Sequence, residues 1–372
     1  MLNHICVTGA TGFVGSHFVR AWQSAHPGTV HTLVRPNAQS NGEQRLFAAL
    51  ETARRASGEP CEAPYSNIDC LEADVCLPLC GLTPEAVSGL RTRAIDTFWH
   101  FASDLRFEAH YREQLRVTNV EGAGHALDLA VAIGAKRFVY ISTAYVCGRA
   151  GGLIEEHLSA RDQGFSNDYE ASKAQAEQRV VDRCQALGLA LTILRPSIVL
   201  GPRKTKSLEG AETGLFSLVH AVLWIKSLQS RRTAPARVAA LPEAEINFVP
   251  VDCVVSDMMA LAHTGFGDQM IYHLTSRSCP TVSACWQALS SVIGLSSIVL
   301  VEPGSFDPSP IEHLVVRRLG FFMSYLDVER TFVRSLTPHW SVDARDIEDY
   351  VKNAVALIGR TDPLVALEKG RV

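Results

Sequence analysis

The sequence predicts a doubly wound α/β fold, in which helices cover both faces of a parallel sheet, with a smaller and mostly C-terminal α/β lobe. Short β-branched runs alternate with longer helical patterns over the N-terminal half of the chain, which indicates βαβ units. The strand-like runs are continuously apolar, as strands covered on both faces require. A glycine-rich turn also separates the first predicted strand from the first predicted helix.

The predicted elements follow one another in a regular order. Runs with the length and composition of strands cover residues 4–9, 29–35, 66–74, 94–102, 137–143 and 189–197. Longer patterns typical of helices cover residues 13–25, 111–133 and 168–187. This alternation makes the helices crossovers between parallel strands.

The regular alternation ends after Gly201. Residues 203–214 are polar and contain glycine, which is typical of a loop, and an amphipathic helix is expected at about 215–228. A strand that leads into a helix is predicted over 245–263, and a further strand over 269–276.

The composition excludes several classes of protein. The 372 residues are 47% hydrophobic and 20% charged, as in ordinary globular proteins. A formal charge of −4 without a block of Lys or Arg argues against a nucleic-acid or membrane-surface binder. No apolar run approaches the roughly 18 residues of a membrane span, and the N-terminus lacks the pattern of a secretory signal. We therefore expect a cytoplasmic protein.

Cysteine and histidine give no support for a metal. The ten cysteines are Cys6, Cys61, Cys70, Cys76, Cys80, Cys147, Cys184, Cys253, Cys279 and Cys285, and we expect buried, reduced thiols. A metal site built from Cys70, Cys76 and Cys80 is the alternative, but no C-x-x-C pair or nearby His supports it. The thirteen histidines form no H-x-x-x-H or H-E-x-x-H pattern, so we expect no catalytic metal.

The glycine-rich turn predicts a nucleotide site. Its residues include Gly9, Thr11, Gly12, Phe13, Val14 and Gly15. The first glycine permits a tight turn, the second lets the backbone approach a pyrophosphate, and the third allows close packing of helix on strand. The unpaired N–H groups at the start of the following helix attract the same negative charge.

The end of the second predicted strand predicts which dinucleotide binds. An acidic residue there would favour NAD, but the sequence has Arg35 and no carboxylate before Glu43. The guanidinium of Arg35 suits a 2′-phosphate, so we predict NADP(H). After the third strand, Asp74 and the backbone N–H of Val75 are suited to the adenine amino group and ring, with a helix cap as the alternative for Asp74.

Tyr169 and Lys173 are the best candidates for acid–base chemistry. They lie four residues apart, so both side chains project from the same face of a helix. We expect the ammonium and a positive nicotinamide to stabilise the phenolate and lower the pKa of the phenol, which is normally near 10. Thr143 or Ser142, at the end of the fifth strand, would hydrogen-bond a substrate carbonyl or hydroxyl.

These motifs together resemble the extended short-chain dehydrogenase/reductase family. The likeness covers roughly residues 1–275 and rests on Tyr169, Lys173 and the ordered motifs GATGFVG, HFAS, TNVEGAGHALDLA, RFVYISTAYV and LRPSIVLGP. It implies a triad of Thr143, Tyr169 and Lys173, with Ser142 as the less favoured substitute for Thr143. In that triad Tyr169 is the acid–base group, and Lys173 also bonds the nicotinamide ribose.

The resemblance also implies further cofactor-binding residues and a domain plan. Phe101, Ala102 and Ser103 would line the cofactor, Asn119 would orient the central helix, and Pro196, Ser197 and Ile198 would flank the nicotinamide amide. The implied Rossmann-type, NADP(H)-binding domain comprises residues 1–200 with contributions from about 245–275. Residues 201–244 and 276–372 would form the substrate-binding lobe.

Within that family the sequence is most similar to the thioester reductases and fatty acyl-CoA reductases. The similarity rests on LVRP at the second strand, STAYV at the fifth, RPSIVLG with a basic loop after it, and NFVPVDCVV near 247–255. It implies NADPH-dependent reduction of an acyl group held as a thioester on coenzyme A or a carrier protein, to an aldehyde or an alcohol. The final hundred residues match no motif, and we expect them to encode substrate choice.

Other functions remain open from the sequence. Reduction of other carbonyls with NADPH fits every motif, whereas a sugar-nucleotide epimerase would favour an acidic residue in place of Arg35. A non-catalytic NADP(H)-binding regulator is a further alternative. Basic residues that could meet phosphates of coenzyme A or a carrier, or form a solvated loop, are Arg203, Lys204, Lys206, Arg231 and Arg232. The family likeness also implies a homodimer.

Overall fold

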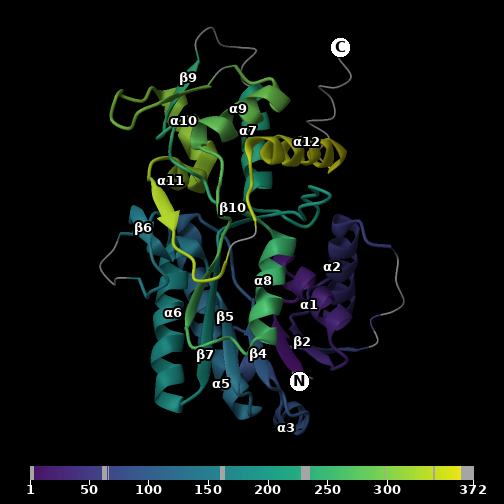
Figure 1. Ribbon diagram of the computed structural model, residues 1–372. Helices are drawn as coiled ribbons and strands as arrows, with labels where there is room; N and C mark the ends of the chain where they lie inside the picture. The colour runs from purple at the N-terminus through teal and green to yellow at the C-terminus, as the bar shows by residue number, and fades with distance from the viewer. Residues whose placement is uncertain are drawn as a thin grey trace.

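A parallel sheet of seven strands forms the centre of the computed structural model, which describes residues 4–60, 65, 67–159, 164–227, 235–296, 298–337 and 340–361. The strand order is β11-β7-β5-β4-β1-β2-β3 (Figure 1). The strands are β1 (Ile5–Thr8), β2 (Val30–Val34), β3 (Ile68–Glu72), β4 (Thr97–His100), β5 (Arg137–Ile141), β7 (Ala190–Pro196) and β11 (Ile271–Leu274). Each lies within a predicted strand, and the predicted Rossmann-type fold class is confirmed.

Two layers of helices cover the sheet (Figure 1). One layer contains α1 (Phe13–Ala25), α2 (Gly42–Ser57) and α8 (Val251–His263), and the other contains α3 (Pro84–Thr92), α5 (Gly122–Ala132) and α6 (Asp168–Leu187). Alternate residues of β1 supply the two layers, because Ile5 and Val7 pack into the first and Cys6 into the second. This two-sided burial explains why the strands are apolar at successive positions.

The helix α2 was not predicted, although the sequence carries a signal for it. The Asn41 side chain accepts a 2.8 Å hydrogen bond from the backbone N–H of Gln44, and the Gln44 side chain accepts one of 3.1 Å from the N–H of Asn41. This reciprocal capping box satisfies two N–H groups at the start of the helix. At the other end, Gly58 adopts a φ of 68°, which favours glycine.

The predicted helix over 111–133 contains a π-helical turn. It consists of α4 (Arg112–Leu115), the π-helical turn η3 (Arg116–Glu121) and then α5. The turn widens the helix where it packs on the segment after β3, and a Cβ at Gly122 would lie 3.2 Å from the Val75 side chain. Such turns are rare and recur at functional sites.

A third hydrophobic cluster lies in the lobe above the sheet (Figure 1). Its helices are α7 (Leu215–Ser227), α9 (Val282–Ile293), α10 (Pro310–Leu319), α11 (Met323–Leu326) and α12 (Ala344–Thr361). Three parallel strand pairs join it: β9 (Ala236–Ala239) with β12 (Ile298–Val301), β8 (Ile198–Leu200) with β10 (Phe248–Pro250), and β6 (Gly152–Ile154) with β13 (Arg330–Phe332). Short 3₁₀ turns are η1 (Pro78–Gly81), η2 (Ala109–Tyr111), η4 (Ala144–Cys147) and η6 (Gly320–Phe322). The division into two domains stays a prediction.

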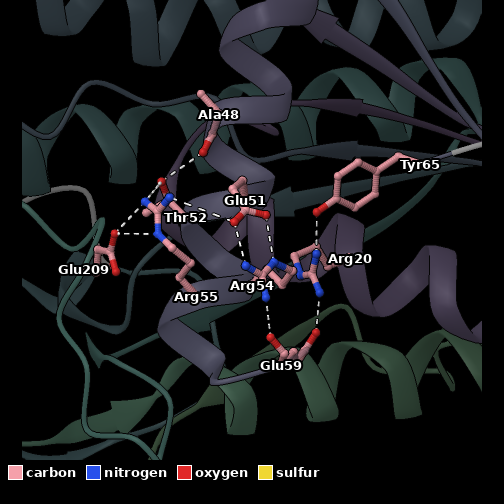
Figure 2. A network of polar contacts seen from close by, with 9 residues as sticks. All are labelled: Arg20, Ala48, Glu51, Thr52, Arg54, Arg55, Glu59, Tyr65 and Glu209. Atoms are coloured by element: carbon pink, nitrogen blue, oxygen red, sulfur yellow. Dashed lines mark hydrogen bonds and ion pairs between the residues drawn. The ribbon is translucent and has the colours of Figure 1, made fainter. Parts of the chain in front are cut away.

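The loop 203–214 is attached to the C-terminal half of α2. Arg55 Nη2 lies 2.6 Å from a carboxylate oxygen of Glu209, and the Thr205 hydroxyl donates a 2.6 Å bond to the carbonyl oxygen of Ala56. Figure 2 shows that this contact belongs to a larger polar network, which continues through Arg54 and Glu59 to Arg20 on α1. The loop is therefore held against the helix layer that contains α1 and α2.

The described part of the chain adds three general observations. The nine cysteines in these ranges are free thiols, and Cys61 lies outside them. Within the same ranges, no helix combines the length and the apolar composition that crossing a membrane requires. The described residues also include no cluster of three or more His, Cys, Asp or Glu side chains arranged to hold a metal.

Candidate active site

A pocket of about 230 Å³ opens at the carboxyl ends of β1, β4, β5 and β7, the edge where doubly wound sheets bind ligands. The predicted site residues that line it are Gly9, Gly12, Phe13, Val14, Gly15, Phe101, Ser103, Ser142, Thr143, Tyr169, Lys173, Pro196, Ser197 and Ile198. The other predicted residues, Thr11, Arg35, Asp74, Val75, Ala102 and Asn119, do not line it. Two wider surface hollows, along α6 and beside β11, contain none of the predicted residues.

The glycine turn forms a cradle that side chains would fill. Gly9 has a φ of +72°, and a Cβ there would lie 2.6 Å from the carbonyl carbon of Phe101. A Cβ at Gly15 would lie 3.0 Å from the carbonyl carbon of Gly9 and closer still to its oxygen. In the described structure, no side chain caps the N-terminus of α1, and its first turn contains no acidic residue. These residues fit a pyrophosphate, which would accept from the free N–H groups.

The adenosine end of the predicted cofactor site lies outside the pocket, beyond the ends of β2 and β3. Arg35 Nη1 lies 3.8 Å from Asp74 Oδ2, and Asp74 Oδ1 accepts a 3.0 Å bond from the N–H of Cys76. A second guanidinium, on Arg45 of α2, donates to the carbonyl oxygen of Arg35. Sequence reasoning missed Arg45, although the capping box at Asn41 would have placed it in the first turn of a helix.

The three residues of the predicted triad all line the pocket. Tyr169 and Lys173 lie on α6, whose N-terminus is capped by the Asn167 side chain through a 2.8 Å bond from the N–H of Glu170. Thr143 is the second residue after the end of β5, and its hydroxyl accepts a 3.3 Å bond from the N–H of Tyr145. The Ser142 hydroxyl is also buried and lines the pocket, with no hydrogen-bond partner among the described residues.

Burial dominates the protonation of these groups. It lowers the pKa of Lys173 to about 7, because a charged ammonium is costly away from water. It also raises the pKa of Tyr169 above its usual value, and the nearby Glu170 carboxylate raises it further. The expected lowering by Lys173 is therefore not present in the protein itself. Burial and then the Lys173 charge lower the pKa of the neighbouring His100 to about 3, so that this imidazole stays neutral.

Asn119 positions the segment after β4 rather than facing the pocket. Its side-chain oxygen accepts bonds from the Ser103 hydroxyl at 3.1 Å and the Asp104 N–H at 2.7 Å. Its amide nitrogen donates to the Asp104 carbonyl oxygen at 3.0 Å and to the Ser172 hydroxyl at 2.9 Å. Asn119 thus joins the π-helical turn, the pocket wall and α6, and its role in orienting the central helix stays a prediction.

Several pocket residues were not predicted. They are Leu105, Phe107, Ile141, Tyr145, Val199, Ala211, Thr213, Gly214 and Tyr325. Tyr145 belongs to the STAYV motif, so its place after β5 was a usable signal. Phe107 meets the Tyr169 ring edge-on, with the ring centroids 5.3 Å apart. Tyr325 comes from the C-terminal lobe, where no motif marks it.

The predicted basic cluster is largely engaged by the protein's own groups. Lys206 pairs with Asp346 and lies 5.0 Å from the Tyr350 ring. The Arg203 guanidinium lies 4.8 Å from the Trp340 ring, while Lys204 is exposed. Arg231 and Arg232 lie outside the described residues. Lys206 and Arg203 therefore contact groups of the protein itself, and a role of the basic cluster in binding phosphates stays a prediction.

The glycine cradle, the seven-stranded parallel sheet and the pocket at its carboxyl edge define a nucleotide-binding protein of the extended short-chain dehydrogenase/reductase class. The chain belongs to the NAD-binding family described as male sterility protein, whose model matches residues 7–258. The predicted family resemblance is therefore confirmed, and the match establishes the NAD(P)-binding class of the domain.

Relatives of known name are similar over part of their length. Peramine synthetase A of Epichloe festucae is 24% identical over 77% of this chain and 10% of its own length. Fatty acyl-CoA reductase 2 of Mus musculus is 26% identical over 73% of this chain and 57% of its own length. The UDP-glucose 4-epimerase of Vibrio cholerae is 27% identical over 54% of this chain and 53% of its own length. The chain thus spans between a tenth and about half of these relatives.

Solved structures share the fold over nearly the whole chain. The terminal R domain from the myxalamid PKS-NRPS biosynthetic pathway has a TM-score of 0.72 at 23% identity and covers 97% of this chain and 91% of its own. A thiolation-reductase di-domain from an archaeal non-ribosomal peptide synthetase has a TM-score of 0.71 at 17% identity, covering 97% of this chain and 76% of its own. At these identities the likeness establishes the fold.

Proposed function

We propose that this chain uses NADPH to reduce an acyl thioester, carried on coenzyme A or on a carrier protein, to an aldehyde or an alcohol. The observation that carries the proposal is the meeting of Thr143, Tyr169 and Lys173 in the pocket that also contains the glycine cradle. The family match, and the likeness to a fatty acyl-CoA reductase and to reductase domains of synthetases, support this reaction among those that the fold performs.

The charges at the adenosine end favour NADPH over NADH. Arg35 and Arg45 bring two guanidiniums to the end of β2, where a 2′-phosphate would lie. Asp74 lies 3.8 Å from Arg35, which leaves this carboxylate paired with the guanidinium rather than free for a ribose hydroxyl. Two cations beside one paired carboxylate favour an anionic cofactor group by charge-assisted hydrogen bonds.

The triad residues would polarise the thioester carbonyl. The hydroxyls of Thr143 and Tyr169 would donate to its oxygen, and negative charge that develops there would be stabilised by donors already held in place. Lys173 lies one helical turn from Tyr169, and a positive charge on Lys173 would stabilise the phenolate that forms when Tyr169 gives up its proton to the substrate. Burial makes each of these effects stronger than in water.

The reaction would proceed by addition and collapse. Bound NADPH would supply a hydride to the carbonyl carbon, and Tyr169 would supply the proton that the carbonyl oxygen takes up, which gives a hemithioacetal. On collapse the hydroxyl of the hemithioacetal would lose its proton, the C=O bond of the aldehyde would re-form, the C–S bond would break, and the departing sulfur would take up that proton as a free thiol. Reduction of the aldehyde to an alcohol would need a second NADPH for the hydride and a reprotonated Tyr169 for the proton.

The first test follows the consumption of NADPH and NADH by absorbance, with a short-chain acyl-CoA or the matching aldehyde as substrate. Wild type is compared with Tyr169→Phe and with Tyr272→Phe, a tyrosine outside the pocket whose hydroxyl donates 2.6 Å to the carbonyl oxygen of Phe266. We expect acyl-CoA turnover with NADPH that falls by roughly 100-fold or more in Tyr169→Phe and persists in Tyr272→Phe.

Other outcomes separate the alternatives. Turnover of the aldehyde alone, with acyl-CoA and carrier-bound thioesters both inert, would replace the proposal with NADPH-dependent carbonyl reduction. Binding of NADPH without turnover of either substrate would support the non-catalytic regulator. Full activity of Tyr169→Phe would remove Tyr169 from the mechanism.

A further inference from the structure

Segment 276–372 of the predicted lobe contributes Tyr325 to the wall of the pocket. Among the described residues that line the cavity, all except Tyr325 come from residues 9–214. Tyr325 lies on the short helix α11, within the hydrophobic cluster of the lobe, and its side chain is only 6% exposed. The lobe thus reaches the predicted reacting groups through this phenol ring.

The residues that line the pocket differ in exposure. Leu105 is 43% exposed and Thr213 is also exposed, whereas Tyr169 and Tyr325 are buried. A thioester on coenzyme A or a carrier protein keeps its long arm in solvent, so we expect the arm to leave past the exposed residues. The acyl chain lies on the other side of the carbonyl carbon, so we expect it to point toward the buried residues, called here the buried end.

Two of the buried lining residues, Tyr145 and Tyr325, are tyrosines whose rings pack on each other. The ring centroids of Tyr325 and Tyr145 are 4.4 Å apart, with the planes inclined by 50°. Tyr145 follows Thr143 by two residues, and its N–H donates to the Thr143 hydroxyl. The position of the aromatic pair is therefore tied to that of Thr143, the residue expected to polarise the carbonyl.

Side chains of the C-terminal lobe pack against these two tyrosine rings. The Arg330 guanidinium lies 5.6 Å from the Tyr145 ring, and Phe332 meets the same ring edge-on at 5.5 Å. Both residues lie on β13, which pairs in parallel with β6, and Phe322 meets the Tyr325 ring edge-on at 5.9 Å. Displacing either tyrosine would disturb packed rings or a strand pair, so the wall is rigid.

We propose that Tyr325 determines substrate specificity by limiting the length of the acyl chain, so that the preferred substrates are thioesters of short acyl groups. The inference rests on the proposed function, because it names the substrate class for the same site. A short chain ends before the Tyr145–Tyr325 pair, whereas a long chain collides with the Tyr325 ring. Removal of that ring opens the buried end toward the lobe.

The test compares butanoyl-, octanoyl- and dodecanoyl-CoA with NADPH in wild type, Tyr325→Leu and Tyr325→Phe. We expect wild type to prefer the shortest substrate, and Tyr325→Leu to raise the dodecanoyl-to-butanoyl ratio of kcat/KM by about tenfold or more. Tyr325→Phe keeps the ring and should keep the ratio. Trp224→Leu is the matched control, since Trp224 packs on the same cluster but does not line the pocket.

A binding measurement tests the role of Tyr325 independently of catalytic turnover. Linear aldehydes of increasing length are titrated into the protein with NADPH bound, and the change in NADPH fluorescence gives each dissociation constant. We expect Tyr325→Leu to tighten binding of long aldehydes relative to short ones by about tenfold. If Tyr325→Leu unfolds, Tyr325→Trp provides the opposite test, because a larger ring should exclude octanoyl chains as well.

The possible results lead to distinct conclusions. A wild type that prefers dodecanoyl-CoA, or a folded Tyr325→Leu with unchanged ratios, overturns the inference. An equal shift of the kcat/KM ratio in Trp224→Leu or in Tyr325→Phe also overturns the inference. The volume of the Tyr325 ring would then not be what determines the preferred chain length. No thioester turnover in wild type, together with aldehyde binding that Tyr325→Leu relaxes, would refute the proposed reaction and support the role of Tyr325.

Discussion

The ammonium of Lys173 donates a 2.7 Å hydrogen bond to the carbonyl oxygen of Ile141, the last residue of β5. The same nitrogen lies 4.2 Å from the Tyr140 ring centroid, and the side chain is only 2% exposed. The bond joins α6 to the carboxyl edge of the sheet beside Thr143. The protein therefore keeps a cation where burial opposes its charge, and this position gives Lys173 its lowered pKa.

Replacing Lys173 by Met should stabilise the protein near neutral pH while abolishing turnover. The pKa of Lys173 falls from 10.5 to about 7 on folding, so below pH 7 the folded state holds a costly charge. We expect a gain of about 2 kcal/mol in unfolding free energy at pH 6.5, after the lost hydrogen bond is deducted.

The pH dependence of this gain gives a further check. Between about pH 7 and pH 10.5 the unfolded state binds more protons at Lys173 than the folded state, so the stability of wild type rises with pH. The advantage of Lys173→Met should therefore shrink over this range. Urea unfolding at several pH values measures it, with the exposed Lys136→Met as control. A gain that is constant with pH would contradict the assignment.

Arg35→Ala and Arg45→Ala should each weaken NADPH binding by about tenfold or more, because each removes a guanidinium from the end of β2. NADH, which lacks the 2′-phosphate, should bind the variants and the wild type alike. Fluorescence titration with both cofactors measures the difference, and Arg91→Ala on α3 is the control. Equal losses for the two cofactors would mean that neither guanidinium recognises the phosphate.

Gly9→Ala should cost much more than Gly188→Ala, although both glycines have positive φ. Their φ angles are +72° and +64°, so both substitutions place Ala in an unfavourable conformation, at about 1–2 kcal/mol. A Cβ at Gly188 meets nothing within 4 Å, whereas at Gly9 it would collide with the Phe101–Ala102 backbone. Urea unfolding should separate the two, and NADPH binding should be lost in Gly9→Ala alone. Equal stability and equal NADPH binding in the two variants would contradict the role of Gly9 in the glycine cradle.

The buried pair of Arg195 and Glu177 should be costly to break. Arg195 Nη2 and Nε lie 2.6 and 2.9 Å from the two carboxylate oxygens, and both side chains are 1% exposed. Glu177→Gln or Arg195→Met should lower the unfolding free energy by about 3–5 kcal/mol, because the remaining charge is unpaired. The surface pair Arg183–Asp128 is the comparison, and Arg183→Ala should cost less than about 1 kcal/mol. Similar losses at both pairs would contradict the effect of burial.

The sequence predicts the nucleotide-binding half well because its signals are local. The helix predicted over 13–25 is α1 with the same bounds, and the helix over 168–187 is α6. Apolar runs and glycine turns act within one element, so they can be recognised without knowing the contacts. The π-helical turn at 116–121 was missed because no local pattern in its residues marks it, and it is followed by a close contact of Gly122 with Val75 from another segment.

Local signals also predict one part of the candidate site, whereas tertiary contacts alone determine the other part. Thr143, Tyr169 and Lys173 follow from spacing on a helix and from position at a strand end, and the structure brings them into one pocket. Tyr325 could not be predicted, because its position depends on tertiary packing. It lies on α11, and the strand that follows, β13, pairs with the distant strand β6. Arg45 could have been predicted from the sequence, but only after the start of α2 had been recognised.

The π-helical turn that carries Asn119 has a consequence for the regularity of the helix. A π-helical hydrogen bond spans one residue more than an α-helical one, so the stretch from Arg112 to Ala132 would become a regular α-helix only if one residue were removed from 116–121. Asn119 lies within that turn and bonds to the segment after β4 and to α6, so such a removal would act first on this contact.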